Sequence, residues 1–352
     1  MTEHTTAPSG LDIVTVDSIT AIGRDHWNRF AGTDNPLVGY DFLEALEASG
    51  SVCRDTGWQP CHLTFYLDGH WIGVAPAYRK FHSMGEYVFD WAWADAWQRH
   101  GLPYYPKLVV AIPFTPCQGP RLMIPGPARA DLAPEQLHQA LDHLMAREGL
   151  HSWHLLFPDS DDQALLASPT ALHRHGCQFH WFNRGYQSFD DFLAQLTSRK
   201  RKSIRKERRQ VAEQGITFEH WSGDALPDDV LDDFFLFYNA TYLKRGMQPY
   251  LNRTFFHRLA QRLGKGLRII TALREGQRIA AALFIVGEDC LFGRYWGCLD
   301  DYNHLHFETC YYQGIDLAIH EGLARFDAGA QGEHQLVRGG DPVTTHSWHI
   351  VA

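Results

Sequence analysis

Alternating apolar and polar residues in two distant stretches predict two β-hairpins. The first joins CHLTFYL to HWIGVAPAYRK through Asp68-Gly69, and the second joins LRIITAL to QRIAAALFIVG through Glu275-Gly276. Alternation places every second side chain on one face of a strand, and a glycine-containing pair between two such runs is a strong hairpin signal. Further strands are predicted at LDIVTVDSI, HSWHLLF and CLFGRYWGCL.

Apolar residues at helical spacing predict helices before both hairpins and after the second one. In the first half, one helix opens after Pro36 and another covers residues 134–149. The second half adds helices at LDDFFLFYNATYLKRG, at NRTFFHRLAQRLGKG and from about Phe307 to Gly322.

The two hairpins align with a constant offset of 207 residues, which also pairs Ile72 with Ile279 and Ala75 with Ala282. Since helices precede both hairpins, the pattern predicts two copies of one α/β unit with mainly antiparallel sheets. A chain of 352 residues is also long for a single core. We expect a tail and first strand over 1–34, a first domain over 35–160 and a second over 161–352.

Composition places the chain among soluble cytoplasmic proteins. The first residues, MTEHTTAPSG, have neither the basic start nor the apolar run of a signal peptide. The chain contains no stretch of about 18 apolar residues, so no membrane span is predicted. The seven cysteines are scattered without a CxxC pair, which is typical of reduced, buried thiols.

Positive charge is concentrated in one segment, RKRKSIRKERR at 199–209, where eight basic side chains stand against one Glu. The remaining residues hold 24 basic and 40 acidic side chains, a net charge of −16. Most of the surface therefore repels phosphate, which argues against a general nucleic-acid binder. A local polyanionic ligand is the favoured explanation for the segment.

We expect this segment to lie on a helix over 189–214, about 39 Å long, that begins after Ser188 and stops at Gly215. A fully solvated helix is the alternative, although such helices mix charges and Glu207 is the only acid within the basic segment. The candidate phosphate-binding residues are Lys200, Arg201, Arg205, Arg208 and, from a later glycine-rich segment, Arg338.

Three blocks resemble the FemAB-like N-acyltransferases, a bacterial family of the GNAT superfamily that is connected with peptidoglycan biosynthesis. The blocks are EYVFDWAWADAWQRHGLPYYPKLVVAIPFTPCQGPRL, SRKRKSIRKERRQVAEQGI and HLHFETCYYQGIDLAIHEGLARFDAGAQGEHQLVRG, and the similarity runs from about residue 35 to 350. The resemblance implies two tandem GNAT-like domains with helix-flanked sheets. It also implies acyl transfer to an amine of a small molecule or cell-wall precursor. An aminoacyl-tRNA or acyl-CoA would be the co-substrate, without a tightly bound cofactor.

The chain departs from the GNAT pattern at the expected CoA-binding turn. That turn, R/Q-x-x-G-x-G/A, joins a strand to a helix and offers backbone N–H groups to the pyrophosphate. Here Arg262-Leu-Gly-Lys-Gly266 follows a predicted helix and precedes a strand, and Gln118-Gly-Pro-Arg121 is only a fragment. This departure argues against acetyl-CoA as the acyl donor and slightly favours an aminoacyl-tRNA. Related proteins are also expected to continue beyond HSWHIVA with a further C-terminal segment.

Candidate chemistry concentrates in Asn303–Gln313, at the entrance to a predicted helix. Amide formation needs an acceptor for the amine proton, for which Glu308 and His306 are suitable, and Tyr311 or Tyr312 can protonate a leaving group. Alternatively, Glu308 only caps the helix and the histidines occupy a polar loop. A nucleophilic Cys310 is a further alternative.

Two other groups of residues admit functional interpretations. The first group is interpreted as the lining of a substrate groove. The alternative is that its aromatic residues are buried in the core. A metal site from His304, His306 and Glu308 requires a strand, but the helix expected by Phe307 breaks their alternation, so no metal site is predicted. The histidines 173, 175 and 180 receive no role. The predicted groove residues are Asp90, Trp93, Tyr105, Lys107 and Arg121.

A rival hypothesis keeps the duplicated fold but removes catalysis, so that the chain only recognises RNA or a phosphorylated precursor. Replacing Glu308 and His306 by alanine distinguishes the two hypotheses, because an enzyme that uses these residues would lose turnover.

Overall fold

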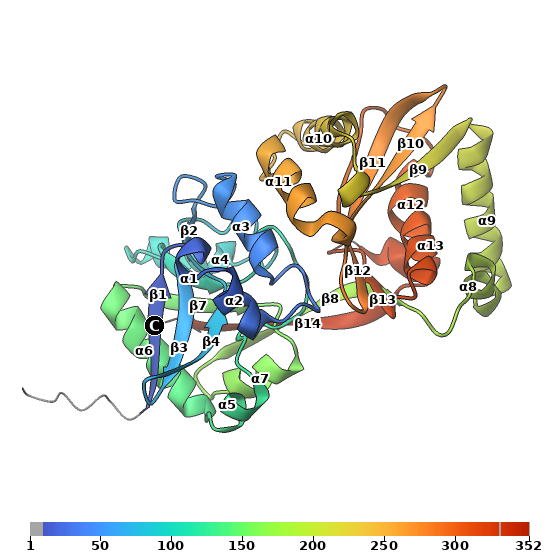
Figure 1. Ribbon diagram of the computed structural model, residues 1–352. Coiled ribbons are helices and arrows are strands. Elements are labelled where there is room, and N and C mark those ends of the chain that lie inside the picture. Colours follow the sequence, from blue (N-terminus) through green and yellow to red (C-terminus); the bar gives the residue numbers. More distant parts are fainter. Residues whose placement is uncertain (1–9, 331, 352) are drawn as a thin grey trace, which may run out of the picture. The chain divides into compact units, whose positions relative to one another are not determined.

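The structure of the protein is a computed structural model that describes residues 10–330 and 332–351 (Figure 1). The chain forms two compact units. Unit 1 holds Leu37–Gly176 with the described parts of Met1–Gly32 and Thr345–Ala352, and unit 2 holds Thr33–Pro36 and Cys177–Thr344. The predicted border between residues 160 and 161 lies at the start of a helix within unit 1.

Unit 1 contains two sheets, in the strand orders β1-β3-β4 and β2-β5-β6-β7, and β14 pairs with β7. Among its strand pairs between described residues, β6 and β7 are parallel, and the pairs β1–β3, β3–β4, β2–β5, β5–β6 and β7–β14 are antiparallel. Its elements are β1 (Leu11–Val16), α1 (Ile19–Ile22), α2 (Arg24–Ala31), α3 (Tyr40–Ala48), β2 (Trp58–Pro60), β3 (His62–Leu67), β4 (His70–Ala75), β5 (Ala77–Lys80), α4 (Trp91–Arg99), β6 (Lys107–Val110), α5 (Gly126–Ala130), α6 (Pro134–Glu148), β7 (Ser152–Leu156), α7 (Ser160–Leu166), the first part of β8 (Leu172–Phe182) and the last part of β14 (Asp341–Val351).

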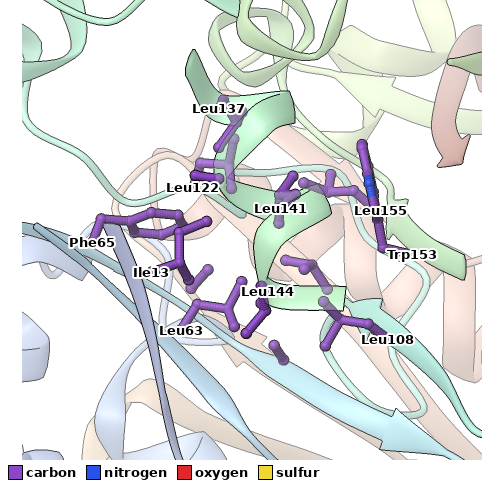
Figure 2. Close-up of a cluster of buried hydrophobic side chains, with 14 of the residues drawn as sticks. Ile13, Leu63, Phe65, Leu108, Leu122, Leu137, Leu141, Leu144, Trp153 and Leu155 are labelled. Atoms are coloured by element: carbon purple, nitrogen blue, oxygen red, sulfur yellow. The ribbon is translucent and has the colours of Figure 1, made fainter. Parts of the chain in front are cut away.

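Helix α6 supplies the central apolar face of unit 1. Its residues Leu137, Leu141 and Leu144 recur at helical spacing and are buried in one cluster with Trp153 and Leu155 of β7 (Figure 2). Burial of each such side chain contributes about 1.5–3 kcal/mol. The predicted helix over 134–149 and the predicted strand HSWHLLF are therefore confirmed, and their packing forms this core.

Unit 2 contains one sheet in the strand order β8-β13-β12-β11-β10-β9, and helices cover it on both faces (Figure 1). Only β12 and β13 pair in parallel among its strand pairs between described residues. Its elements are the second part of β8, α8 (Phe189–Gln195), α9 (Ser198–Glu213), β9 (Ile216–Ser222), a 3₁₀ turn (Gly223–Ala225), α10 (Asp228–Leu243), α11 (Arg253–Leu263), a 3₁₀ turn (Gly264–Gly266), β10 (Leu267–Arg274), β11 (Gln277–Val286), β12 (Cys290–Cys298), α12 (Leu305–Phe307), a π-helix (Glu308–Tyr312), α13 (Gln313–His320), β13 (Arg325–Asp327), a 3₁₀ helix (Glu333–Arg338) and the first part of β14.

The two predicted hairpins are present, and they have the same turn and register. Both turns have two successive residues of positive φ, at 48° and 81° for Asp68-Gly69 and at 53° and 76° for Glu275-Gly276. This is the conformation of a type I′ turn, in which glycine is free of strain. Each hairpin also has one register shift, between Phe65 and Tyr66 and at the aligned Ala272/Leu273.

A second irregularity also recurs at aligned positions. In unit 1 the strand changes partner at Pro76, since β4 pairs with β3 before it and β5 pairs with β6 after it. The aligned position in unit 2 is Leu283, where the register between β11 and β12 shifts. A parallel strand–helix–strand unit follows in both copies, as β6-α6-β7 and β12-α13-β13. The predicted duplication of a mixed α/β unit is confirmed.

The single helix predicted over 189–214 is wrong, because the chain forms α8 and α9 with a break between them. Leu196 ends α8 in an extended conformation, and Thr197 begins a new helix by accepting the Lys200 N–H at its Oγ1. The predicted start at Ser188 is confirmed, since its Oγ accepts the Asp191 N–H.

Candidate functional site

The predicted catalytic segment forms a π-helix, Glu308–Tyr312, between α12 and α13. One-turn π-helices inside α-helices occur frequently at functional sites because the wider turn redirects side chains. Glu308, Tyr311 and Tyr312 are all buried in this turn. Each of the three contacts a different set of polar groups.

Glu308 forms an ion pair with Arg208 of α9. The Arg208 Nε lies 3.2 Å from both carboxylate oxygens, and the Gln313 Nε2 donates to Oε1 at 2.8 Å. Arg208 also donates to Asp316 Oδ2 at 2.9 Å, and its guanidinium lies over the Phe189 ring at 4.3 Å. Burial alone would lower the pKa of Arg208, but the two carboxylates raise it, so the guanidinium stays charged.

The neighbouring residue of α9, Glu207, forms a second ion pair. In this pair α9 supplies the carboxylate rather than the guanidinium. Glu207 accepts both the Arg338 Nη2, at 3.0 and 3.1 Å, and the Tyr312 hydroxyl. Arg338 also donates to the His334 carbonyl at 2.8 Å and lies 3.4 Å above the Phe307 ring. Residues 207 and 208 of α9 therefore attach this helix to the π-helix and to the Glu333–Arg338 turn.

His306 and Tyr311 lie in a separate hydrogen-bonding environment. The His306 Nδ1 is 3.5 Å from Cys310 Sγ, and burial lowers the pKa of this histidine to about 4. The Tyr311 hydroxyl is 3.2 Å from His334 Nε2, and burial raises its pKa. At neutral pH both side chains are therefore uncharged. Their predicted catalytic roles stay predictions, as does that of Glu308.

A pocket of about 650 Å³ lies beside this network, with walls from the start of α8, β9, β10 and α13. Asp316 and His220 line it, and burial raises the pKa of Asp316. Asp316 connects to Glu308 through Arg208, and His220 connects to Glu308 through Gln313, whose Oε1 is 2.9 Å from His220 Nε2. The pocket thus exposes a carboxylate and an imidazole, held by Arg208 and Gln313 respectively, and both of these residues contact Glu308 of the π-helix.

Sequence reasoning missed this pocket because its residues come from four distant segments that share no motif. A signal for the ion-pair network beside it was nevertheless present in α9. Ile204 and Val211 are the buried residues of that helix, and Glu207 and Arg208 stand three and four positions after Ile204. Side chains at that spacing lie on one face of a helix, so both charges are directed inward.

The predicted phosphate-binding residues divide into two groups. Arg208 and Arg338 are engaged in the ion pairs just described. The other three lie at the surface: Lys200 donates to the Leu336 carbonyl, Arg201 contacts the Ala194 carbonyl, and Arg205 pairs with Asp190. All five assignments stay predictions.

The outward face of α9 carries three cations that the sequence did not single out. Arg199, Lys202 and Lys206 are exposed and follow a spacing of three and four residues, which places them along one side of the helix. None of them pairs with a carboxylate of the residues that the structure describes. They form an uncompensated basic stripe, here called the α9 stripe.

The predicted substrate groove of unit 1 is only partly assembled. Lys107 is fully buried, and its Nζ donates to Ser83 and Glu86 at 2.8 Å and to Asp90. Tyr105 joins them through Ser83 at 2.7 Å and also lines a surface pocket of about 490 Å³.

Trp93 and Arg121 have other neighbours. Trp93 lies under the Arg174 guanidinium at 5.1 Å. Arg121 is fully buried and donates to main-chain carbonyls, including that of Leu156 at 2.9 Å. The structure therefore brings together Asp90, Tyr105 and Lys107, and it does not bring Arg121 into their cluster.

The segment considered for a metal has helical rather than strand geometry. His304 has a φ of 60° and directly precedes α12, so His304, His306 and Glu308 do not alternate along a strand. Separately, none of the helices among residues 10–330 and 332–351 combines the length and the apolar character that crossing a bilayer requires.

Comparison with solved structures shows the fold. The crystal structure of FemX aligns with a TM-score of 0.57 at 12% identity, covering 94% of this chain and 96% of that one. The C-terminal domain of a putative lysylphosphatidylglycerol synthetase from Agrobacterium fabrum aligns with a TM-score of 0.57 at 10% identity, covering 95% and 93%. L-PGS from Bacillus licheniformis aligns with a TM-score of 0.53 at 13% identity, covering 91% and 92%.

At the level of sequence, no curated protein matches the chain. A family model does, over residues 18–352, and its description is peptidoglycan biosynthesis/recognition. The match includes the basic segment, the π-helix and both copies of the α/β unit. The chain therefore belongs to the FemAB-like family.

Proposed function

We propose that the chain is an N-acyltransferase that transfers an acyl or aminoacyl group from a polyanionic donor to an amine. The observation that carries this proposal is the pairing, in one unit, of the α9 stripe with the Asp316 pocket. The stripe offers uncompensated positive charge for donor phosphates, and the pocket offers a proton acceptor. Membership of a family described by peptidoglycan biosynthesis/recognition supports the same class of reaction.

An aminoacyl-tRNA suits the stripe better than acyl-CoA does. Arg199 and Lys206 are seven residues apart, which corresponds to about 10 Å along the helix axis. An exposed row of that length matches successive phosphates of a nucleic acid strand. By contrast, the strand-to-helix connection after β12 contains Asp300 and Asp301 and no glycine, which does not suit a pyrophosphate.

Asp316 is the proposed proton acceptor. Its side chain is 35% exposed, lines the pocket and is held by Arg208. When the amine nitrogen attacks the donor carbonyl, a C–N bond forms and the C–O bond to the tRNA hydroxyl breaks. The amine proton passes to Asp316, which then returns this proton to the departing tRNA oxygen. In this proposal Glu308 positions Arg208, and the acceptor is a cell-wall precursor with a free amine.

The donor is tested by binding of tRNA and of acetyl-CoA to wild type and to the R199E/K202E/K206E variant. A control variant, R29E/R54E/R99E, makes the same change of charge at exposed positions of unit 1. We expect tRNA binding to be lost in the first variant and kept in the second. If wild type binds neither tRNA nor acetyl-CoA, the proposed donor class is wrong.

Catalysis is tested by transfer of a radiolabelled aminoacyl group from tRNA to a precursor peptide with a free amine. Wild type should form the labelled amide, and D316N should bind tRNA equally but form none. The rival, a non-catalytic binding protein, would bind tRNA in both forms without any transfer. It would also bind tRNA unchanged when Glu308 and His306 are replaced by alanine.

A further inference from the structure

Three histidines gather on the surface of unit 1, whereas the site proposed for acyl transfer belongs to unit 2. His173 and His175 belong to β8, and His346 belongs to β14. One ring nitrogen from each lies within 4.8 Å of the others. The closest contact joins His173 Nε2 to His346 Nδ1 at 2.9 Å, and the His173 and His175 rings are 4.2 Å apart.

Strand geometry explains why these imidazoles share a face. Residues 173 and 175 are two positions apart on β8, so their side chains project to the same side. Arg174, between them, projects to the other side, where it donates to the Phe89 carbonyl at 3.0 Å and covers the Trp93 ring. The third histidine comes from a segment more than 170 residues later in the sequence.

Packing against the core of unit 1 fixes the positions of the histidine rings. Trp348, two residues after His346, stacks on the His173 ring with 4.0 Å between centroids and 8° between planes. That tryptophan is 8% exposed and belongs to the main apolar core of unit 1. A Cβ at Gly176 would lie 2.6 Å from Thr345 Oγ1, so the two strands approach closely beside the histidines. The cluster therefore stands on ordered backbone.

Each of the three imidazoles offers one ring nitrogen as a ligand atom. Neutral imidazole has a free nitrogen lone pair for a metal ion. No carboxylate among the described residues forms an ion pair with these three histidines. His173 and His175 are exposed, so an ion can reach them from solvent.

We propose that His173, His175 and His346 bind one zinc ion, with a water molecule as the fourth ligand. Zinc binds imidazole nitrogen at about 2.0–2.1 Å, so nitrogens in a tetrahedral site are about 3.3 Å apart. Small side-chain rotations bring nitrogens that already lie within 4.8 Å to that separation. An all-imidazole set selects zinc, copper or nickel over magnesium and calcium, which require oxygen ligands.

Zinc titration calorimetry of the full chain without an affinity tag tests the proposal. Wild type should bind one zinc ion saturably at pH 7.5. H175A should weaken the affinity at least tenfold, and H346A should do the same. A matched control, H143A, removes an exposed histidine of α6 and should bind zinc as wild type does.

The proposal is overturned if wild type shows no saturable zinc binding or if H175A and wild type bind zinc with equal affinity. His175 is exposed, so its replacement should leave the fold intact, and circular dichroism of each apo variant checks this. Tenfold weakening in H143A would show that zinc binds elsewhere on the surface, and that outcome also contradicts the site.

Discussion

Arg208 of α9 and Glu308 of the π-helix form an ion pair in which the guanidinium contacts the carboxylate at 3.0 to 3.2 Å. Glu308 is 4% exposed and Arg208 is 28% exposed at the side chain. Removing one partner of such a pair leaves a desolvated charge without compensation. This pair holds α9 against the segment that carries the predicted catalytic residues.

We therefore expect E308A to lower the free energy of unfolding by about 1–3 kcal/mol, less than for a fully buried pair because Arg208 is partly exposed. Urea denaturation measures the change, and a double-mutant cycle with R208M isolates the coupling. E213A is the matched control, since Glu213 forms an exposed pair with Arg209 on the same helix. That control should cost no more than about 0.5 kcal/mol. Equal losses in E308A and E213A would contradict the structural role of Glu308.

Replacement of single cations of the α9 stripe should change the salt dependence of tRNA binding. Each phosphate contact that is lost lowers the slope of log affinity against log salt by about 1. We expect this change for K206A, because Lys206 is exposed and belongs to the uncompensated stripe. K244A is the control, since Lys244 follows α10 and its Nζ lies 4.0 Å from Asp301 Oδ1. An unchanged slope in K206A would show that Lys206 does not contact a phosphate of the tRNA.

The hairpins and most helices could be predicted from the sequence because their signals are local. Period-two alternation and an Asp-Gly or Glu-Gly turn determine a hairpin within about 20 residues, and the offset between the two hairpins indicated the duplication. The break at Thr197 was missed because the sequence alone does not distinguish a threonine that caps a helix from a threonine inside a helix. Its N–H···Oγ1 contact with Lys200 is visible only in the structure.

The candidate site could be predicted less well because it depends on contacts between distant segments. Composition identified the basic run but not which cations turn inward, and Arg208 and Arg338 are paired with Glu308 and Glu207 respectively. The helical phase of Ile204 would have indicated the inward direction of Arg208. No local spacing indicates that His220 and Asp316 line one pocket.

Replacing Asp316 should abolish transfer without weakening tRNA binding, and wild type should lose activity in acid. Burial raises the pKa of Asp316 above its ordinary value of about 3.9, and Arg208 opposes that rise. Only the ionised carboxylate accepts a proton, so activity should fall as the pH drops through the raised pKa. The pH profile of single-turnover transfer measures this limb. A limb at or below pH 4 would argue against Asp316 as the acceptor.

Acid should destabilise unit 1 through a buried histidine pair, His154 and His349, whose Nδ1 atoms are 2.7 Å apart. Burial lowers the pKa of His349 to about 3 and that of His154 well below its ordinary value. Arg174 and Lys107 lower the pKa of His349 further, and Asp90 opposes them. In the unfolded chain both histidines titrate near pH 6.5. The stability from their neutral forms is therefore complete above about pH 6.5 and is lost as the pH falls from there towards 3.

The variant H349Q removes one of these titrating groups while keeping a polar side chain beside His154. We expect its free energy of unfolding to fall less between pH 7 and pH 5 than that of wild type, because fewer protons are taken up on unfolding. Urea denaturation at the two pH values measures the difference. H143Q, which replaces an exposed histidine of α6, should keep the wild-type pH dependence. Equal losses in wild type and H349Q would show that the acid sensitivity arises from other groups.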